Sequence, residues 1–226
     1  MLAQTLRDLD LGHSRRILDA GCGTGKTLSA LSVTLPARGF GLDIAAAAAA
    51  YWPRRELSRM CLASVDDIPF RDGAFDAALG IDVLESDEVD ERRAYRELWR
   101  VVREGGYLVL VVPAYRWLFS PEHHCAVHAS RRYTRRDVAA VLRAAPVRVV
   151  RMTHLFMSTL LPAALYRLWL RRRRIRVTPR SELRRLPSVI DEALFRIVDA
   201  ERRVLRRFDL PFGSSILVVV QKTAKS

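Results

Sequence analysis

The chain has 226 residues, half of them hydrophobic, and 38 lysines and arginines against 25 aspartates and glutamates give a formal net charge of +13. A chain of this length can bury one sizeable α/β core. Three cysteines, an odd number, and an N-terminus without a cleavable signal argue against a disulfide-stabilised scaffold. No apolar run reaches the ~18 uncharged residues of a membrane-spanning helix, so we expect a cytoplasmic protein.

Apolar periodicity predicts that strands and helices alternate along the chain. A helical segment at 1–14, placed to cover a ligand, precedes strands at about 16–20, 39–43, 75–79, 107–112, 147–152 and 214–221. Helices are expected near 26–35, 45–58, 88–103 and 134–144. This alternation predicts an α/β fold with a parallel sheet and helices on both of its faces.

The first strand leads into a glycine-rich loop, and the second strand ends in a carboxylate. Residues 17–25 read I-L-D-A-G-C-G-T-G, and Asp43 closes the sequence G-F-G-L-D at 39–43. Glycine lets the backbone turn sharply and approach a ligand, and the N–H groups that begin the next helix attract an anion. A carboxylate at the tip of the next strand accepts hydrogen bonds from both hydroxyls of a ribose. We therefore expect a nucleoside-containing ligand.

Three classes of cofactor site compete for this loop. A dinucleotide site uses G-x-G-x-x-G, whereas the glycines here are spaced G-x-G-x-G. Residues 20–27 read A-x-x-x-x-G-K-T, a relaxed P-loop in which Lys26 would contact phosphates and Thr27 a magnesium ion. The third class is the D-x-G-x-G-x-G loop with which class I methyltransferases hold the methionyl end of S-adenosyl-L-methionine (SAM). The loop alone does not decide between these classes.

The segments after Asp43 favour the third class. They read S-V-D-D-I-P-F at 64–70, G-A-F-D-A-A-L-G-I-D-V-L-E at 73–85 and E-L-W-R-V-V-R-E-G-G-Y-L-V-L-V-V-P at 97–113. In this order and spacing, the chain from about 15 to 150 resembles the class I (Rossmann-like) SAM-dependent methyltransferases. The resemblance is strongest to the methyltransferase type 11 subgroup, whose best-known members methylate quinones and other small molecules. A P-loop protein has no reason to carry the last two segments.

The resemblance implies a seven-stranded, mostly parallel sheet with an antiparallel last strand, and SAM as the cofactor. It implies that the loop holds the methionine amino and carboxylate groups largely through its backbone, and that Asp43 binds the ribose. The acid usual beside the adenine is replaced in register by Ser64, so the Ser64 hydroxyl, Asp66 and the Val65 backbone are alternatives. Asp82 is expected to face both cofactor and substrate. The cofactor-binding set is then Asp19, Gly21, Gly23, Gly25, Asp43, Ser64, Val65 and Asp82.

About sixty residues separate the last two predicted strands, more than an ordinary connection needs. We expect two helices there, separated by 179–187, with the second over 188–208. The resulting organisation is a SAM-binding core with its N-terminal helical segment over 1–153, a helical cap over 154–210 inserted before the last strand, and that strand over 211–226.

Basic residues cluster in this cap, where R-R-R-R at 171–174 follows an apolar run at 155–170. Such a block favours an anionic partner. The apolar run is too short to span a bilayer but suits its surface, so peripheral membrane contact through 155–176 is an alternative to a simple lid. Aromatic residues are not spaced through the basic block, which disfavours nucleic acid.

A polar cluster follows the fifth strand, in E-H-H-C-A-V-H at 122–128 and R-R-Y-T at 131–134. This edge of an α/β sheet borders the substrate pocket. His124 and His128 are open to three interpretations: a metal site, a general base, or loop orientation by hydrogen bonding. Alignment alone also accelerates methyl transfer, because the sulfonium is a strong electrophile. Our candidate catalytic residues are His124, His128 and Tyr133, with no metal.

The sequence thus predicts a SAM-dependent methyltransferase that acts on oxygen or nitrogen, or else carbon, of a small-molecule or lipid-like acceptor. One alternative is a P-loop-type nucleotide-binding protein. The other is a methyltransferase-fold binding protein without activity.

Overall fold

The structure is a computed structural model. It describes residues 2–11, 15–118, 129–143, 145–158 and 188–223, together with the single positions 160, 162, 164, 165 and 168.

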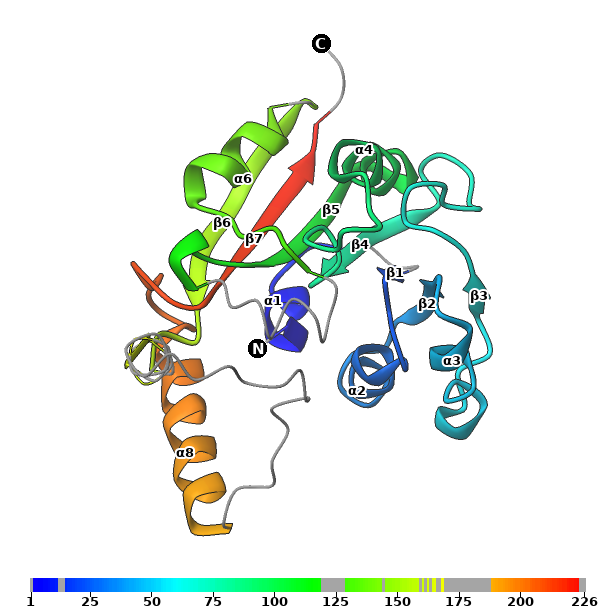
Figure 1. Cartoon of the computed structure of the whole chain (residues 1–226). Helices are drawn as coiled ribbons and strands as arrows, with labels where there is room; N and C mark the ends of the chain where they lie inside the picture. The colour runs from blue at the N-terminus through cyan, green and yellow to red at the C-terminus, as the bar shows by residue number, and fades with distance from the viewer. Residues whose placement is uncertain are drawn as a thin grey trace.

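Seven strands form one sheet in the order β3-β2-β1-β4-β5-β7-β6 (Figure 1). They are β1 (Arg16–Ala20), β2 (Arg38–Asp43), β3 (Met60–Leu62), β4 (Phe75–Ile81), β5 (Val102–Pro113), β6 (Val147–Leu155) and β7 (Ser215–Lys222). Only β7 runs antiparallel to its neighbours, β5 and β6. The predicted seven-stranded, mostly parallel sheet is therefore confirmed, and β3 is the strand that only the family resemblance implied.

Helices cover both faces of the sheet, as predicted (Figure 1). They are α1 (Leu2–Arg7), α2 (Lys26–Thr34), α3 (Ala46–Ala49), α4 (Glu91–Val101), α6 (Arg135–Leu142) and α8 (Ser188–Val204), with 3-10 turns η1 (Pro53–Arg55) and η2 (Arg116–Leu118). The prediction of a single helix near 45–58 is wrong. Its alanine run forms only α3, and Pro53, which lacks an N–H, instead begins η1.

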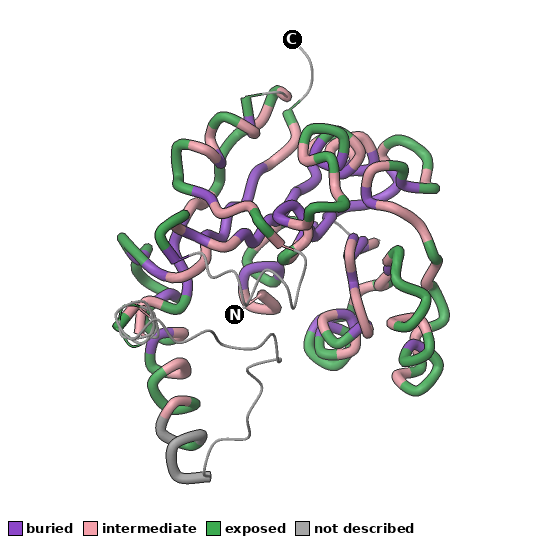
Figure 2. The backbone as a smooth tube through the Cα atoms, in the orientation of Figure 1, coloured by how far each residue is buried: buried purple, intermediate pink, exposed green. Residues whose placement is uncertain are grey.

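Two hydrophobic clusters hold these layers together. On one face, Leu98 of α4 and Val138 of α6 pack with strand residues, and on the other Leu6 of α1 and Leu31 of α2 do so. Figure 2 shows the buried backbone concentrated in the central strands between the two helical layers. Because Leu6 is fully buried against the sheet, α1 is part of the core, and its expected role over the cofactor stays a prediction.

The insertion between β6 and β7 is tied to the core at its base. Glu201 of α8 accepts hydrogen bonds from the N–H groups of Met157 (3.1 Å) and Ser158 (2.8 Å) and from the Ser158 hydroxyl (2.7 Å). Arg151 of β6 donates to Asp209 (2.7 Å) just after α8. From this base α8 extends away from the sheet (Figure 1). The second predicted helix is thus present, and among the described residues no helix is long and apolar enough to cross a membrane.

Candidate active site

The carboxyl ends of the parallel strands bring the predicted site residues to one edge of the sheet. Asp19 lies near the end of β1, Asp43 ends β2, and Asp82 directly follows β4. In open α/β sheets ligands bind outside this edge, where loops are splayed apart by crossovers in opposite directions. The strand order reverses at β1, whose two neighbours are β2 and β4, so Asp19 lies at this reversal.

The glycine loop after β1 has a backbone that only glycine adopts easily. Gly21, Gly23 and Gly25 have φ angles of +76°, +52° and +78°. A Cβ at Gly21 would lie 2.6 Å from the Val83 side chain, so this position must stay small. At Gly23 a Cβ would meet nothing within 4 Å, which shows open space above the loop. The loop therefore leaves room for a ligand against its backbone.

Asp43 holds this loop in place. Its two carboxylate oxygens accept hydrogen bonds from the N–H groups of Gly23 (2.7 Å) and Ala45 (2.8 Å). The Trp52 indole donates to the Gly23 carbonyl (2.8 Å). A carboxylate oxygen has two lone pairs and can accept a second hydrogen bond, so Asp43 retains acceptor capacity for ribose hydroxyls.

Asp19 is a buried carboxylate whose hydrogen-bonding capacity is not fully used within the described residues. Its side chain is 1% exposed, and its Oδ2 has no hydrogen-bond partner among the described residues. Burial, with a further contribution from Asp43, raises the pKa of Asp19 to about 7. SAM carries an ammonium and a sulfonium, which a pair of carboxylates stabilises, so these residues fit that cofactor. A triphosphate would instead be repelled, which argues against the P-loop alternative.

Cys22 lies in the same loop but takes no part in proton chemistry. Burial, then Asp19 and Asp43, raise the pKa of its thiol to about 12. The thiolate is the reactive form of cysteine, so Cys22 is inert at neutral pH.

The loop after β3 lies next to Asp43, because the Ala63 N–H donates to the Asp43 carbonyl (3.1 Å). Here the Ser64 hydroxyl accepts from the Asp66 N–H (3.1 Å), and Asp66 Oδ2 accepts from the Asp90 N–H (3.1 Å) at the start of α4. Asp66 Oδ1 is buried without a partner in the described part of the chain, and Val65 is buried. All three alternatives for adenine binding therefore remain predictions, with Asp66 Oδ1 as an available acceptor.

The loop after β4 contains an ionisable group that the sequence did not single out. Glu85 is 5% exposed, and its Oε2 has no partner within the described ranges. Burial, followed by repulsion from Asp82, raises the pKa of Glu85 to about 8. Asp82 itself is exposed and has a left-handed φ of +50°, a strained conformation typical of functional loops.

Among the candidate catalytic residues, His124 and His128 lie outside the described residues. Tyr133 is buried, and its hydroxyl donates to the Leu84 carbonyl (3.1 Å). Burial, with Glu91 next, raises the pKa of Tyr133, so its hydroxyl stays neutral. This geometry gives Tyr133 a structural bond, and its catalytic role stays a prediction. Within the described ranges no group of three histidine, cysteine or acidic residues could hold a metal.

A buried histidine at the carboxyl end of β6 was also missed. His154 Nε2 lies 3.3 Å from the Tyr115 hydroxyl, and the two rings stack with centroids 5.7 Å apart. Burial lowers the pKa of His154, which favours the neutral ring. A lone histidine in an apolar strand gives no sequence signal, because its partner follows a different strand.

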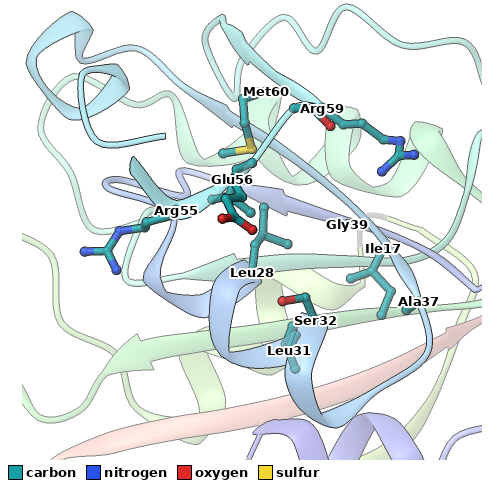
Figure 3. A pocket seen from close by; sticks show the side chains of 12 residues that line it. Ile17, Leu28, Leu31, Ser32, Ala37, Gly39, Arg55, Glu56, Arg59 and Met60 are labelled. Carbon is teal, nitrogen blue, oxygen red and sulfur yellow. The ribbon is translucent and has the colours of Figure 1, made fainter. Parts of the chain in front are cut away.

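One small cavity is distinct from this site. It has a volume of about 200 Å³, and side chains from α2, the start of β2 and residues 55–60 surround it (Figure 3). Small-molecule sites measure roughly 300–1,000 Å³, and none of the predicted cofactor residues lines this cavity. It is therefore not the cofactor site.

Residues 18–110 match a family model described as a methyltransferase domain. The matched stretch contains the glycine loop, Asp43 and the segment 73–85. Over this stretch the chain is similar to the class I SAM-dependent methyltransferases, and its seven-stranded sheet has the fold of solved members. Methyltransferases of this family use SAM, and the carboxylates of the site fit that cofactor.

The chain is similar to several known proteins. It is 31% identical over 109 residues to the O-methyltransferase cnsE of Penicillium expansum, covering 45% of this chain and 39% of that one. It is 38% identical over 103 residues to the probable tRNA methyltransferase 9B of Bos taurus, covering 42% of this chain and 21% of that one. The chain thus spans well under half the length of these relatives.

A solved structure shares the fold over nearly the whole chain. The geranyl diphosphate C-methyltransferase from Streptomyces coelicolor aligns with a TM-score of 0.62 and 20% identity, covering 98% of this chain and 78% of that one. It was solved with Mg²⁺, geranyl diphosphate and S-adenosyl-L-homocysteine. At this identity the likeness establishes the fold.

Proposed function

We propose that this methyltransferase transfers the methyl group of SAM to an oxygen or nitrogen, or else a carbon, of a small-molecule or lipid-like acceptor. The observation that carries the proposal is the pair of carboxylates, Asp19 and Asp43, at the ends of β1 and β2. Asp19 is buried with an unpartnered oxygen, and Asp43 is bonded to the open glycine loop. The negative charge of this pair favours the binding of a cationic nucleoside and disfavours the binding of a negatively charged nucleotide.

Each residue has a distinct part in this reaction. Asp43 would accept from the ribose hydroxyls while it holds the loop, and Asp19 would face the ammonium. The N-terminus of α2 has no side-chain cap, so its N–H groups suit the SAM carboxylate. Bound SAM supplies an electrophilic methyl group, and the chain contributes alignment of the acceptor. Asp82 and Glu85 would border that acceptor at the end of β4.

Exposed apolar side chains around the insertion support a lipid-like acceptor and contact with a membrane surface. Leu165 and Leu168 are 58% and 48% exposed, and Phe208 and Phe212 after α8 are 66% and 48% exposed. Flotation with anionic and neutral liposomes tests this, because each arginine near an anionic leaflet contributes about 1 kcal/mol. We expect binding to anionic liposomes and its loss in a Leu165→Ser, Leu168→Ser variant. Equal failure to float with either liposome would reject the membrane contact.

The activity is tested by two titrations and a product assay. Calorimetry should show that SAM binds and that ATP does not. Mass spectrometry of a panel of acceptors should show S-adenosylhomocysteine formed only with one class of them. If ATP binds more tightly than SAM, the chain is a nucleotide-binding protein. If SAM binds but no acceptor in a broad panel yields product, the chain is a binding protein without activity.

A further inference from the structure

A wide groove between α4 and α6 is a feature that the cofactor site does not explain. It has a volume of about 930 Å³ and lies on the face of the sheet that these two helices cover (Figure 1). Six arginines line it, against only two carboxylates. The arginines are Arg92, Arg96, Arg116, Arg131, Arg132 and Arg143. We call this feature the arginine groove.

Of the two carboxylates of the arginine groove, Asp137 is engaged with the protein itself. Asp137 accepts from the Thr134 N–H (2.8 Å) and hydroxyl (2.9 Å) as part of the cap of α6, and lies 3.9 Å from Arg116. Glu91 lies beside the buried Tyr133 hydroxyl, whose pKa it helps to raise after burial, and its Oε1 is buried without a hydrogen-bond partner among the described residues. The groove therefore keeps a strong excess of positive charge. Arginines gathered in one concave space repel one another, and a bound anion relieves that repulsion.

The inner end of the arginine groove reaches the loop after β4. The Arg131 guanidinium donates to the carbonyls of Leu84 (3.1 Å) and Ser86 (2.5 Å). The Arg132 guanidinium donates to the Ala114 carbonyl (3.2 Å) after β5. These bonds fix two of the cations between the ends of β4 and β5, beside Asp82 and Glu85. A ligand in the groove is thus led to the edge where the methyl group would be transferred.

The chemistry of the lining selects the kind of anion. We propose that the arginine groove binds the phosphate or diphosphate group of the methyl acceptor. This inference rests on the proposed methyltransferase function. The guanidinium fork matches phosphate oxygens in a bidentate manner, and arginines on both walls suit a compact group with several oxygens. Tyr95 and Tyr133 are only 1% and 5% exposed, so their rings offer no stacking platform for the bases of a nucleic acid.

Direct binding of inorganic pyrophosphate tests the groove without any turnover. Calorimetry at low salt should detect binding to the wild-type chain. An Arg96→Gln, Arg116→Gln variant should bind about tenfold or more weakly, because each charge-assisted hydrogen bond is lost. Arg148→Gln, an exposed arginine on β6 outside the groove, is the matched control and should bind like wild type. Unchanged SAM affinity in all variants shows that they are folded.

Two competition arms identify the source of the phosphate. Displacement of pyrophosphate by phosphatidic acid vesicles, but not by phosphatidylcholine vesicles, indicates a lipid phosphate, and displacement by soluble phosphate esters alone indicates a soluble one. Equal pyrophosphate affinity in wild type and the double variant would overturn the proposal. The proposal would also be overturned if the wild-type chain bound transfer RNA and the double variant lost that binding while it kept its binding of pyrophosphate. Pyrophosphate binding without methyl transfer would reject the proposed activity and leave the anion site intact.

Discussion

Replacing Asp19 with asparagine tests whether the buried carboxylate recognises a cation. In the unliganded protein the pKa of Asp19 is about 7 against an ordinary 3.8, through burial first and Asp43 second. SAM, with its ammonium and sulfonium, should bind the ionised carboxylate, so binding must expel a proton below pH 7. Between about pH 8 and about pH 6 the SAM affinity of wild type should fall about tenfold, and Asp19→Asn should not show this slope.

In the unliganded protein, ionisation of Asp19 should lower the stability of the fold. Because the folded-state pKa of Asp19 exceeds its unfolded value, the folded state holds the proton more tightly, and stability falls as the pH rises from about 4 to about 7. A shift of this size corresponds to roughly 4 kcal/mol. Asp19→Asn should therefore be more stable than wild type at about pH 8, despite its weaker binding of SAM.

Calorimetry across this pH range measures the affinities, and thermal unfolding measures the stabilities. The SAM amino group titrates near pH 7.7–8.0, roughly as other α-amino groups do, and comparison with Asp19→Asn removes that contribution. Asp43→Asn should move the midpoint of the wild-type profile to lower pH, because it removes the second cause of the shift. A wild-type SAM affinity that is flat across the range would refute the reasoning.

Three further changes separate ligand binding, chemistry and folding. Asp43→Ala should weaken SAM binding by about 1–3 kcal/mol in calorimetry, whereas Lys26→Ala should change it little, because no phosphate is bound there. If His124 or His128 is the general base, its replacement by alanine should lower turnover by ~10²–10⁴-fold with little change in SAM affinity, and chelator should have no effect. Wild-type turnover in both single variants and the double variant would remove these histidines from the mechanism. Glu201→Ala should lower the free energy of unfolding by about 1–3 kcal/mol in denaturant melts, because two N–H groups lose their acceptor, while SAM affinity stays unchanged.

The cofactor edge could be predicted because its signals are local. A strand, three spaced glycines and a carboxylate after the next strand determine where Asp19 and Asp43 lie, without knowledge of distant contacts. The prediction of one helix near 45–58 was wrong because it extended the high helix propensity of alanine across Pro53. Strand β3 has only three residues, too few for periodicity to detect.

Buried ionisable groups and the arginine groove depend on long-range packing. The raised pKa of Glu85 comes first from burial by residues far away in sequence. The arginines of the groove come from α4, η2, the segment before α6, and Arg143 at the end of α6. In the sequence they are scattered among the other basic residues of a strongly basic chain. Only the packing of α4 beside α6 brings them into one space.

The family match divides the sheet into two parts. The family match ends at residue 110, inside β5, so the half that is recognisable across the family is the half built on β1 to β4. The antiparallel β7 and the edge strand β6 carry the insertion at the opposite end, anchored through Glu201 and Arg151. On the proposed function, substitutions there would change contacts to the acceptor while leaving Asp19 and Asp43 in place. Four arginines of the arginine groove lie in this part of the chain, outside the family match, so binding experiments rather than the match would identify what they hold.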